Sequence, residues 1–291
     1  MKHWFSLAIA LIPLCSFAQG NQSLTVDNSE PLSRVAAAQG EALEIAIRHE
    51  PALLAAFANW GERRVPLVRD QDRWLTVIGV DLDAAPGEHA LVIERDFGVA
   101  GTRNETKRVI VAAKQFPTTE LTVEPGFVDL SPENQERAAR ESRQIAAIYA
   151  TLTPEQYWRE PFQVPIPGTT GGRNFGHRRI FNGQPRNPHS GADLRAATGV
   201  AIHAANRGRV VLAEDLFFSG NAVFLDHGLG VYSVYLHLSE ILAEPGEMIE
   251  KGATLGLAGA TGRVTGPHLH WGVRVLDARV DPFSLLDLGS N

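Results

Sequence analysis

The chain has 291 residues, 44% of them hydrophobic and 21% charged, and its formal net charge is −6 at pH 7. This composition is typical of a globular protein of one large or two modest domains and excludes a fibrous or disordered chain. The negative charge argues against nucleic acid or an anionic membrane surface as a partner.

The first 18 residues predict a secretory signal peptide. A short basic start precedes an almost continuously apolar run, residues 4–14, and Ser16-Phe17-Ala18 offers small residues at the positions that a signal peptidase reads. We expect cleavage after Ala18 and export to the periplasm or cell envelope, or secretion. The apolar run is too short to span a membrane, and no later segment reaches the ~18 apolar residues of a transmembrane helix.

The single cysteine, Cys15, lies inside this segment. A lipid anchor on Cys15 is the alternative to a cleaved leader, but lipoprotein processing prefers a small residue before the cysteine, and this chain has Leu14 there. Removal of the leader leaves a chain without cysteine. The mature protein is therefore expected to form no disulfide and to have no thiol that could act as a ligand or nucleophile.

Residues 25–123 read as short strands separated by turns. Hydrophobic residues alternate at period two in residues 43–47, 74–80 and 91–94, and glycine-containing turns separate them. This pattern predicts a β-sandwich of immunoglobulin-like architecture. The region contains no catalytic constellation. Its role stays open between positioning the chain, binding a regulatory protein and covering a site in the other half.

Residues 129–158 predict a helical linker. Ser131 can cap a helix, and Pro132 suits the first helical position. The segment that follows is rich in Glu, Arg and Ala, with Ile145, Ile148 and Leu152 on one face. We expect a spacer helix that packs against one of its neighbouring domains.

Residues 161–291 predict a second, antiparallel β-rich domain, because glycine is frequent and turns separate short strands such as residues 222–226, 230–237 and 268–275. Seven of the ten histidines lie between His177 and His270. Residues two apart on a strand point to the same face, so His268 and His270 are expected side by side. A pair of this kind on a strand is a signal for metal binding.

His189 and Asp193 supply complementary ligands, because imidazole and carboxylate both bind zinc and catalytic zinc usually has three protein ligands and a water. Gly191 between them allows a tight backbone path. Zinc would lower the pKa of the bound water toward ~7. Spacing alone leaves open which histidine of the 268/270 pair binds metal. Three histidines and an aspartate would suggest a closed structural site, whereas spare histidines suit proton transfer or oxyanion stabilisation, with His237 as the best additional candidate.

These motifs resemble the paired signatures of the lysostaphin-type, LytM-like zinc metallopeptidases. The resemblance covers about residues 161–286 and its parts occur in order. They are Phe175-Gly176, His189-x-x-x-Asp193, Gly199-Val-Ala-Ile-His203, Gly208-Arg-Val, Asn221-Ala-Val-Phe-Leu-Asp226-His227-Gly228, Tyr235-Leu-His237-Leu238, Gly259-Ala-Thr-Gly262 and Gly266-Pro-His268-x-His270.

The resemblance implies one zinc ion per chain, bound by His189, Asp193 and His270, with His237 and His268 as catalytic histidines. It also implies an antiparallel β-sheet with the site in a groove over one face, and peptide stems or cross-links of bacterial peptidoglycan as substrate. Arg178, Phe218 and Asn221 are further candidates for lining the groove, and His227 is expected to be structural.

Two other functions remain as alternatives. Some members of this family have lost their ligands and activate other wall hydrolases, and a small-molecule zinc hydrolase would use the same ligands. Every motif position is filled here. The sequence therefore favours an active endopeptidase.

Overall fold

The structure is a computed structural model, and it describes residues 23–26, 34–169 and 171–288. The predicted signal peptide, residues 1–18, lies outside them. The fold is mainly β, as predicted, and α1 (Pro132–Ala150) is the one α-helix in the described residues. No helix in these ranges combines the length and the hydrophobicity needed to cross a membrane.

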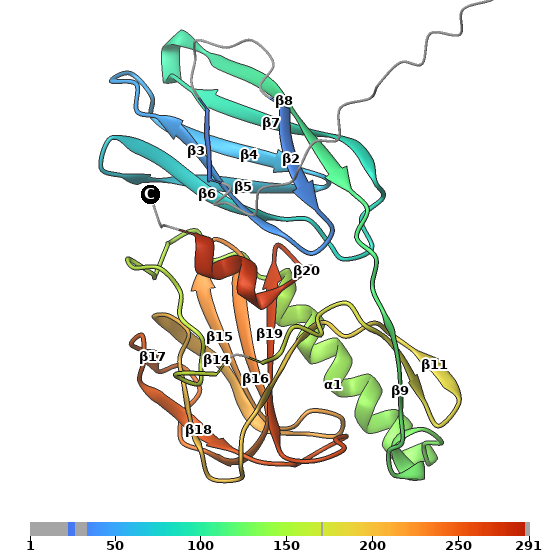
Figure 1. Cartoon of the computed structure of the whole chain (residues 1–291). Coiled ribbons are helices and arrows are strands. Elements are labelled where there is room, and N and C mark those ends of the chain that lie inside the picture. Colours follow the sequence, from blue (N-terminus) through green and yellow to red (C-terminus); the bar gives the residue numbers. More distant parts are fainter. Residues whose placement is uncertain (1–22, 27–33, 170, 289–291) are drawn as a thin grey trace, which may run out of the picture.

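Two packed β-sheets form the N-terminal part of the chain, drawn in blue, cyan and blue-green in Figure 1. The strands follow the hydrogen-bonded order β1-β3-β6-β5-β4-β7-β8-β2. Their bounds are β1 (Ser23–Val26), β2 (Arg34–Ala38), β3 (Ala42–Arg48), β4 (Ala55–Trp60), β5 (Arg63–Asp70), β6 (Arg73–Gly79), β7 (Gly87–Asp96) and β8 (Thr102–Ala112).

Strand β5 passes from one sheet to the other. Its first half pairs with β4, and from Val68 onward it pairs with β6. Alternate residues of the strands point inward, as period two requires, and they form a common core. That core includes Leu43, Ile45, Ile93 and Val109, each at most 1% exposed. The more specific immunoglobulin-like architecture remains a prediction.

The C-terminal part is built on a nine-stranded sheet in which every pair is antiparallel. The strands are β12 (Gly191–Arg195), β13 (Ala201–His203), β14 (Gly208–Leu216), β15 (Gly220–Gly228), β16 (Val231–Ile241), β17 (Met248–Ile249), β18 (Thr254–Ala258), β19 (His268–Val275) and β20 (Ala278–Val280). Short 3₁₀ turns lie at Gly98–Ala100, Pro125–Phe127 and Pro282–Asp287.

Helix α1 covers part of one face of this sheet. The Ser131 hydroxyl accepts a hydrogen bond from the Asn134 amide, which is the expected N-cap. Tyr149 is buried against Phe224 and Tyr232, and the predicted apolar residues Ile145 and Ile148 are partly buried there. The expected contribution of Leu152 was wrong, because the helix ends at Ala150 and Leu152 is 36% exposed.

A three-stranded sheet stands beside the large one, in the order β11-β10-β9. It joins β9 (Thr118–Leu121), which follows the N-terminal sheets, to the hairpin of β10 (Arg178–Phe181) and β11 (Gln184–Arg186). The pairing of β9 with β10 is parallel. Figure 1 shows β9 leading down from the upper sheets to this place. Phe181 is 3% exposed between Val123 and Val128, so two segments distant in sequence share this small core.

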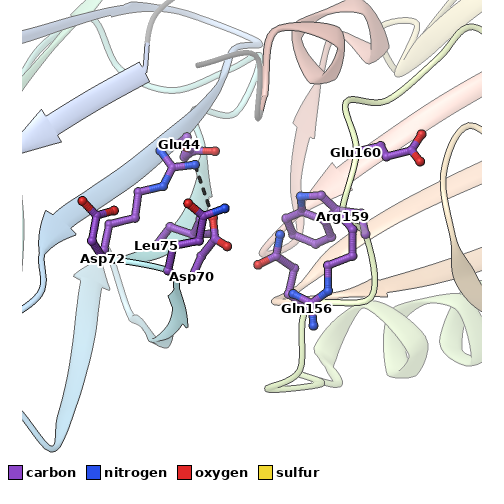
Figure 2. Close-up of a pocket in the computed structure, with 10 residues that line it drawn as sticks. Glu44, Asp70, Asp72, Leu75, Gln156, Arg159 and Glu160 are labelled. Atoms are coloured by element: carbon purple, nitrogen blue, oxygen red, sulfur yellow. Dashed lines mark hydrogen bonds and ion pairs between the residues drawn. The ribbon is translucent and has the colours of Figure 1, made fainter.

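The N-terminal and C-terminal parts touch through an extended interface. Arg279 binds the Asp81 carboxylate with Nη2–Oδ1 at 2.5 Å and Nε–Oδ2 at 3.0 Å, and its Nη2 also lies 2.8 Å from Asp83. The amide of Asp281 donates to the carbonyl of Gly40. Beside this interface, a cavity of about 410 Å³ separates Glu44 and the β5–β6 turn from residues 156–160 (Figure 2). None of the predicted site residues lines it.

Candidate metal centre

Strands β12 and β19 bring the predicted ligands together. The two strands are antiparallel, and the Cα atoms of Asp193 and His270 are direct partners. Period two then places Asp193, His268 and His270 on one face of the sheet, while Leu269 and Trp271 point into the core with 0% exposure. The alternation of apolar and polar residues in β19 therefore fixes which face carries the histidines.

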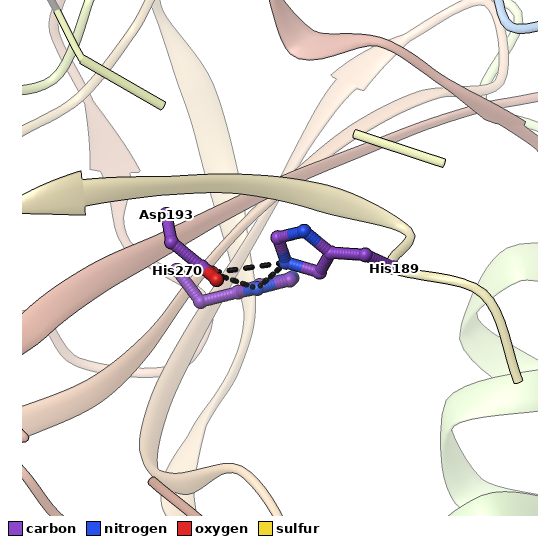
Figure 3. Close-up of side chains that lie close together, drawn as sticks. All are labelled: His189, Asp193 and His270. Carbon is purple, nitrogen blue, oxygen red and sulfur yellow. Dashed lines mark hydrogen bonds and ion pairs between the residues drawn. The ribbon is translucent and has the colours of Figure 1, made fainter. Parts of the chain in front are cut away.

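His189, Asp193 and His270 form a compact triangle of potential ligand atoms (Figure 3). His189 Nε2 lies 2.9 Å from Asp193 Oδ1 and 2.9 Å from His270 Nδ1, and His270 Nδ1 lies 3.0 Å from the same carboxylate oxygen. Four-coordinate zinc with bonds of about 2.0–2.2 Å to such ligands needs separations of roughly 3.3 Å. Small side-chain shifts would open the triangle to that size.

The protons available in this triangle suit a cation at its centre. His189 Nδ1 lies 2.9 Å from the carbonyl of Asn174 and must donate to it, because a carbonyl only accepts. The Nε2 lone pair of His189 therefore faces the Asp193 carboxylate. His189 Nε2, His270 Nδ1 and Asp193 Oδ1 are three electron-pair donors that face one another. When both rings are neutral, at most one proton, on His270 Nδ1, lies between them. Two imidazoles and a carboxylate in this state are ligands of a divalent transition metal.

Burial keeps the imidazoles neutral. It lowers the pKa of His270 to about 4 and also lowers the pKa of His189, although the nearby carboxylate acts in the opposite direction. Burial alone would raise the pKa of Asp193, but the two imidazoles outweigh it and hold the pKa below its usual value. All three groups therefore have the protonation state that metal binding requires at neutral pH.

His237 reaches this face through an irregularity in β16. Strict alternation would point it, like Tyr235, into the core. Val223 pairs with Tyr235, and Asn221 pairs with Leu238. Two residues of β16, Leu236 and His237, therefore lie opposite one residue of β15, Ala222. This is a β-bulge, which re-aims a side chain. His237 also has a φ of +67°, a conformation that non-glycine residues rarely adopt.

His237 and His268 stand next to the triangle. Their ring centroids are 5.0 Å apart, and the His237 centroid lies 6.1 Å from that of His270. His237 Nδ1 donates to the Thr261 carbonyl at 2.9 Å, and His268 Nδ1 donates to the Gly266 carbonyl at 2.8 Å. Each ring therefore has an unprotonated Nε2 when neutral. Burial lowers the pKa of His237 to about 3.

Two side chains outside the predicted set support the triangle. Asn174 accepts a hydrogen bond from the Asp193 amide with its Oδ1 and donates to Asp193 Oδ2 with its Nδ2, both at 3.0 Å. Arg179 donates to the same Oδ2 at 2.7 Å. Together they hold one carboxylate oxygen and leave Oδ1 for the triangle. Sequence reasoning missed both and named the neighbouring Arg178, which is exposed.

Gly191 has a steric reason to be glycine. A Cβ atom there would lie 2.6 Å from His270 Nε2 and 2.5 Å from the carbonyl oxygen of Trp271, both far inside contact distance. The absence of a side chain lets β12 approach the His270 ring. The predicted tight path between His189 and Asp193 is therefore a close contact between two strands.

The structure thus brings all five predicted side chains into one site: His189, Asp193, His237, His268 and His270. Their separate roles, as ligands or catalytic groups, remain predictions. Of the other groove candidates, Phe218 has the guanidinium carbon of Arg263 at 4.4 Å from its ring centre. The Asn221 side-chain amide donates to the Ser239 carbonyl at 3.4 Å. His227 is fully buried and hydrogen-bonded to the Arg207 carbonyl.

Comparison with known proteins places this site inside a recognised sequence family. Residues 187–282 match the model of peptidase family M23. The chain is 40% identical over 99 residues to the peptidoglycan DD-endopeptidase ShyA of Vibrio cholerae and 42% identical over 100 residues to ShyC of the same organism. Each match covers 34% of this chain but only 23% of the relative's length.

One solved structure resembles nearly the whole chain. The crystal structure of a Pseudomonas aeruginosa protein assigned to peptidase M23 is 31% identical, with a TM-score of 0.61. The alignment covers 86% of this chain and 95% of that protein. The likeness therefore includes the N-terminal sheets as well as the histidine-bearing part.

Proposed function

This chain belongs to peptidase family M23, and from that premise we propose that it is a zinc-dependent endopeptidase that hydrolyses peptide cross-links or stem peptides of bacterial peptidoglycan. The observation that carries the proposal is the triangle of His189, Asp193 and His270 with two further histidines beside it. The DD-endopeptidase activity in the names of ShyA and ShyC supports the substrate class.

Each side chain has a task in this proposal. His189 Nε2, Asp193 Oδ1 and His270 Nδ1 would hold the zinc ion, and Asn174 and Arg179 would fix the carboxylate through Oδ2. When bound, zinc supplies a Lewis acid that polarises a peptide carbonyl and makes water more acidic. Because the candidate ligands are neutral imidazoles and one carboxylate, they would leave a bound zinc ion with a net positive charge.

His237 and His268 would move the proton. Each ring is fixed by a backbone carbonyl at Nδ1, and each therefore offers an unprotonated Nε2 that can take a proton from the attacking water. The imidazolium formed in this way becomes a donor that can stabilise an oxyanion or return the proton to the leaving amine. The low pKa of His237 keeps it in the proton-accepting form at neutral pH.

The test is mass spectrometry of muropeptides after digestion of purified sacculi with the zinc-loaded protein. We expect new monomers to form from cross-linked dimers, which also identifies the bond. The His237→Ala variant should keep its zinc, measured by elemental analysis, and lose turnover by about 10²–10⁴-fold. An unchanged muropeptide profile with the wild-type protein would contradict the proposal and favour an activator of another hydrolase.

Export to the cell envelope is part of the same proposal, because a wall substrate lies outside the cytoplasm. It is supported by the signal-peptide pattern of the first 18 residues. N-terminal sequencing of the protein recovered from the envelope should begin at Gln19. A mature protein that still begins at Met1 would contradict export by a cleaved leader.

A further inference from the structure

Three arginines meet at the edge of the candidate metal centre. Arg179 in β10 and Arg186 in β11 are direct partners across the hairpin. Arg263, in the loop between β18 and β19, lies with its guanidinium carbon 4.7 Å from the centre of the Phe181 ring, and that of Arg179 lies 5.9 Å from the same ring. We call Arg179, Arg186 and Arg263 the arginine cluster.

The cluster lacks enough negative charge for its three cations. Among the described residues, its one ion pair is that of Arg179 with Asp193, at 2.7 Å. Arg186 donates to neutral oxygens instead, on Gln184 at 2.7 Å and on the Val128 backbone at 3.3 Å. Like charges placed opposite each other on paired strands destabilise a sheet. The fold therefore keeps a repulsive arrangement that neutral residues would avoid.

The pKa of Arg263 also reflects the excess of positive charge in the cluster. Burial and then repulsion from Arg179 and Arg186 lower the pKa of Arg263 to about 10. The guanidinium still carries its charge at neutral pH. Its face lies 4.4 Å from the centre of the Phe218 ring, so two aromatic rings hold its position.

Two arginines of the cluster are connected to the predicted reacting groups. Arg179 touches Asp193, a predicted metal ligand, through Oδ2. Arg263 follows two residues after Thr261, whose carbonyl fixes the ring of His237. Arg179 and Arg263 are therefore linked to Asp193 and His237 through a hydrogen bond and through the chain.

We propose that the arginine cluster is a subsite for a carboxylate group of the substrate. Guanidinium groups bind carboxylates with two parallel hydrogen bonds, and a bound anion would neutralise the surplus charge. The inference rests on the proposed function and refines it: the preferred substrate is a stem peptide with a free carboxylate near the scissile bond, in contrast to a neutral bridge or an amidated stem. Arg186 and Arg263 are the specificity residues, since Arg179 also holds Asp193.

The experiment compares synthetic cross-linked stem-peptide dimers. One dimer has all carboxylates free, and in each of the others a single carboxylate is replaced by the amide. Equilibrium dissociation constants and kcat/KM are measured with the zinc-loaded full chain for the wild type, Arg186→Gln and Arg263→Gln. Arg274→Gln is the matched control, because Arg274 also lies over an aromatic ring, Tyr149, and donates to a backbone carbonyl.

We expect one particular amidation to weaken wild-type binding and kcat/KM by about 10- to 100-fold, the range of a hydrogen bond to a charged group. With the dimer that has free carboxylates, Arg186→Gln and Arg263→Gln should each lower affinity and kcat/KM by a similar factor. With the dimer amidated at that one carboxylate, the two variants should match the wild type. The carboxylate that shows this coupling is the one bound. Arg274→Gln should behave as the wild type throughout.

Equal losses for the acid and every amide in the two variants, or no losses, would overturn the subsite. The failure of the proposed function gives a different result. A wild-type protein that binds the acid more tightly than one amide but cleaves neither retains the subsite and is not this endopeptidase. Cleavage of all dimers at equal rates would support the endopeptidase activity and contradict the carboxylate subsite.

Discussion

The side chain of Asn174 controls how Asp193 presents its carboxylate. Its amide group binds both the backbone and the side chain of Asp193. The backbone carbonyl of Asn174 fixes the tautomer of His189. Partners of this kind orient metal ligands, and their removal typically lowers metal affinity by about 10–100-fold.

We therefore expect Asn174→Ala to lower zinc affinity by this factor, measured by competition with a chromogenic chelator. The backbone carbonyl remains, so His189 should keep its tautomer. Asn221→Ala is the control, since Asn221 contacts the Ser239 carbonyl and none of the ligands. Wild-type affinity in Asn174→Ala would show that Arg179 alone suffices to hold the carboxylate.

Gly191 offers a second test at the residue scale. The methyl group of Gly191→Ala would overlap the His270 ring and the backbone of Trp271. Overpacking of this kind costs about 1–3 kcal/mol, and relief requires that β12 or His270 move. We expect a lower unfolding temperature together with weaker zinc binding. Gly126→Ala is the control, because a Cβ there meets nothing within 4 Å. Equal effects of the two substitutions would contradict a steric role for Gly191.

At the scale of single elements, β15 and β16 share a buried polar network. His227 Nδ1 donates to the Arg207 carbonyl, and its Nε2 lies 2.7 Å from the Ser233 hydroxyl. That hydroxyl lies 2.9 Å from the Tyr235 hydroxyl, which accepts from the Ala205 amide. With Nδ1 donating to the Arg207 carbonyl, the Nε2 of a neutral imidazole accepts a hydrogen bond from the Ser233 hydroxyl. The structural role expected for His227 thus has a physical basis in this network.

This network predicts acid sensitivity. Burial lowers the pKa of His227 to about 4, against roughly 6.5 in an unfolded chain. Between these values the unfolded chain binds a proton that the folded chain does not. The stabilisation from neutral His227 is therefore complete above about pH 6.5 and is lost as the pH falls toward 4, up to roughly 3 kcal/mol.

Urea unfolding of the metal-free protein at pH 7 and pH 4.5 measures this effect. The loss of unfolding free energy on acidification should be smaller in His227→Gln than in the wild type by roughly 2–3 kcal/mol. The other buried histidines contribute equally to both proteins and cancel in the comparison. Identical losses would mean that His227 titrates normally.

Strand β19 could be predicted from sequence, whereas the path of β16 could not. Alternation in residues 268–275 gave both the strand and its histidine face, and β19 has those bounds. In β16 the same rule points His237 toward the core, and only the bulge opposite Ala222 turns it outward. His237 was a candidate because it is a histidine in the same domain, and the family resemblance supported it, but periodicity did not predict the face on which it lies.

The supporting groups escaped prediction for a related reason. Asn174 and Arg179 precede His189 in a segment with weak periodicity, and their contacts depend on how β10 crosses to Asp193. The parallel pairing of β9 with β10 joins residues about 60 positions apart, and a local sequence pattern cannot predict such a pairing. Sequence therefore predicted which candidate ligands come together, while the position of the side chains around them depends on the tertiary path.

At the scale of the whole molecule, Arg279 fastens the two halves together. Its guanidinium and amide bind Asp81, and burial limits access of water to the pair. Arg63 and Asp277 also join the halves, but their nitrogen and oxygen are 3.9 Å apart and their side chains are 43% and 54% exposed. Hydrogen bonds to charged groups contribute about 1.5–3 kcal/mol when partly buried, whereas exposed pairs contribute about 0–1 kcal/mol.

Arg279→Ala should therefore lower the unfolding free energy by about 2 kcal/mol and increase protease cleavage between the halves. Arg63→Ala, as the matched control, should change stability by less than about 0.5 kcal/mol. Urea unfolding and limited proteolysis measure the two effects. Equal responses of the variants would place the stability of the interface in its apolar contacts.

The position of strand β9 determines which segment of the chain can be transferred to another protein as one functional unit. The arginine cluster rests on Phe181, and Phe181 is buried by Val123 and Val128, which precede the helix. A recombination breakpoint near residue 160 would transfer every histidine of the site and leave behind the strand that supports the cluster. The portable unit, for gene shuffling or for a chimaeric lysin, therefore begins before Thr118. The helix and β9 belong to this unit. A shorter graft is expected to retain the candidate zinc ligands and to lose the substrate discrimination proposed for the arginine cluster.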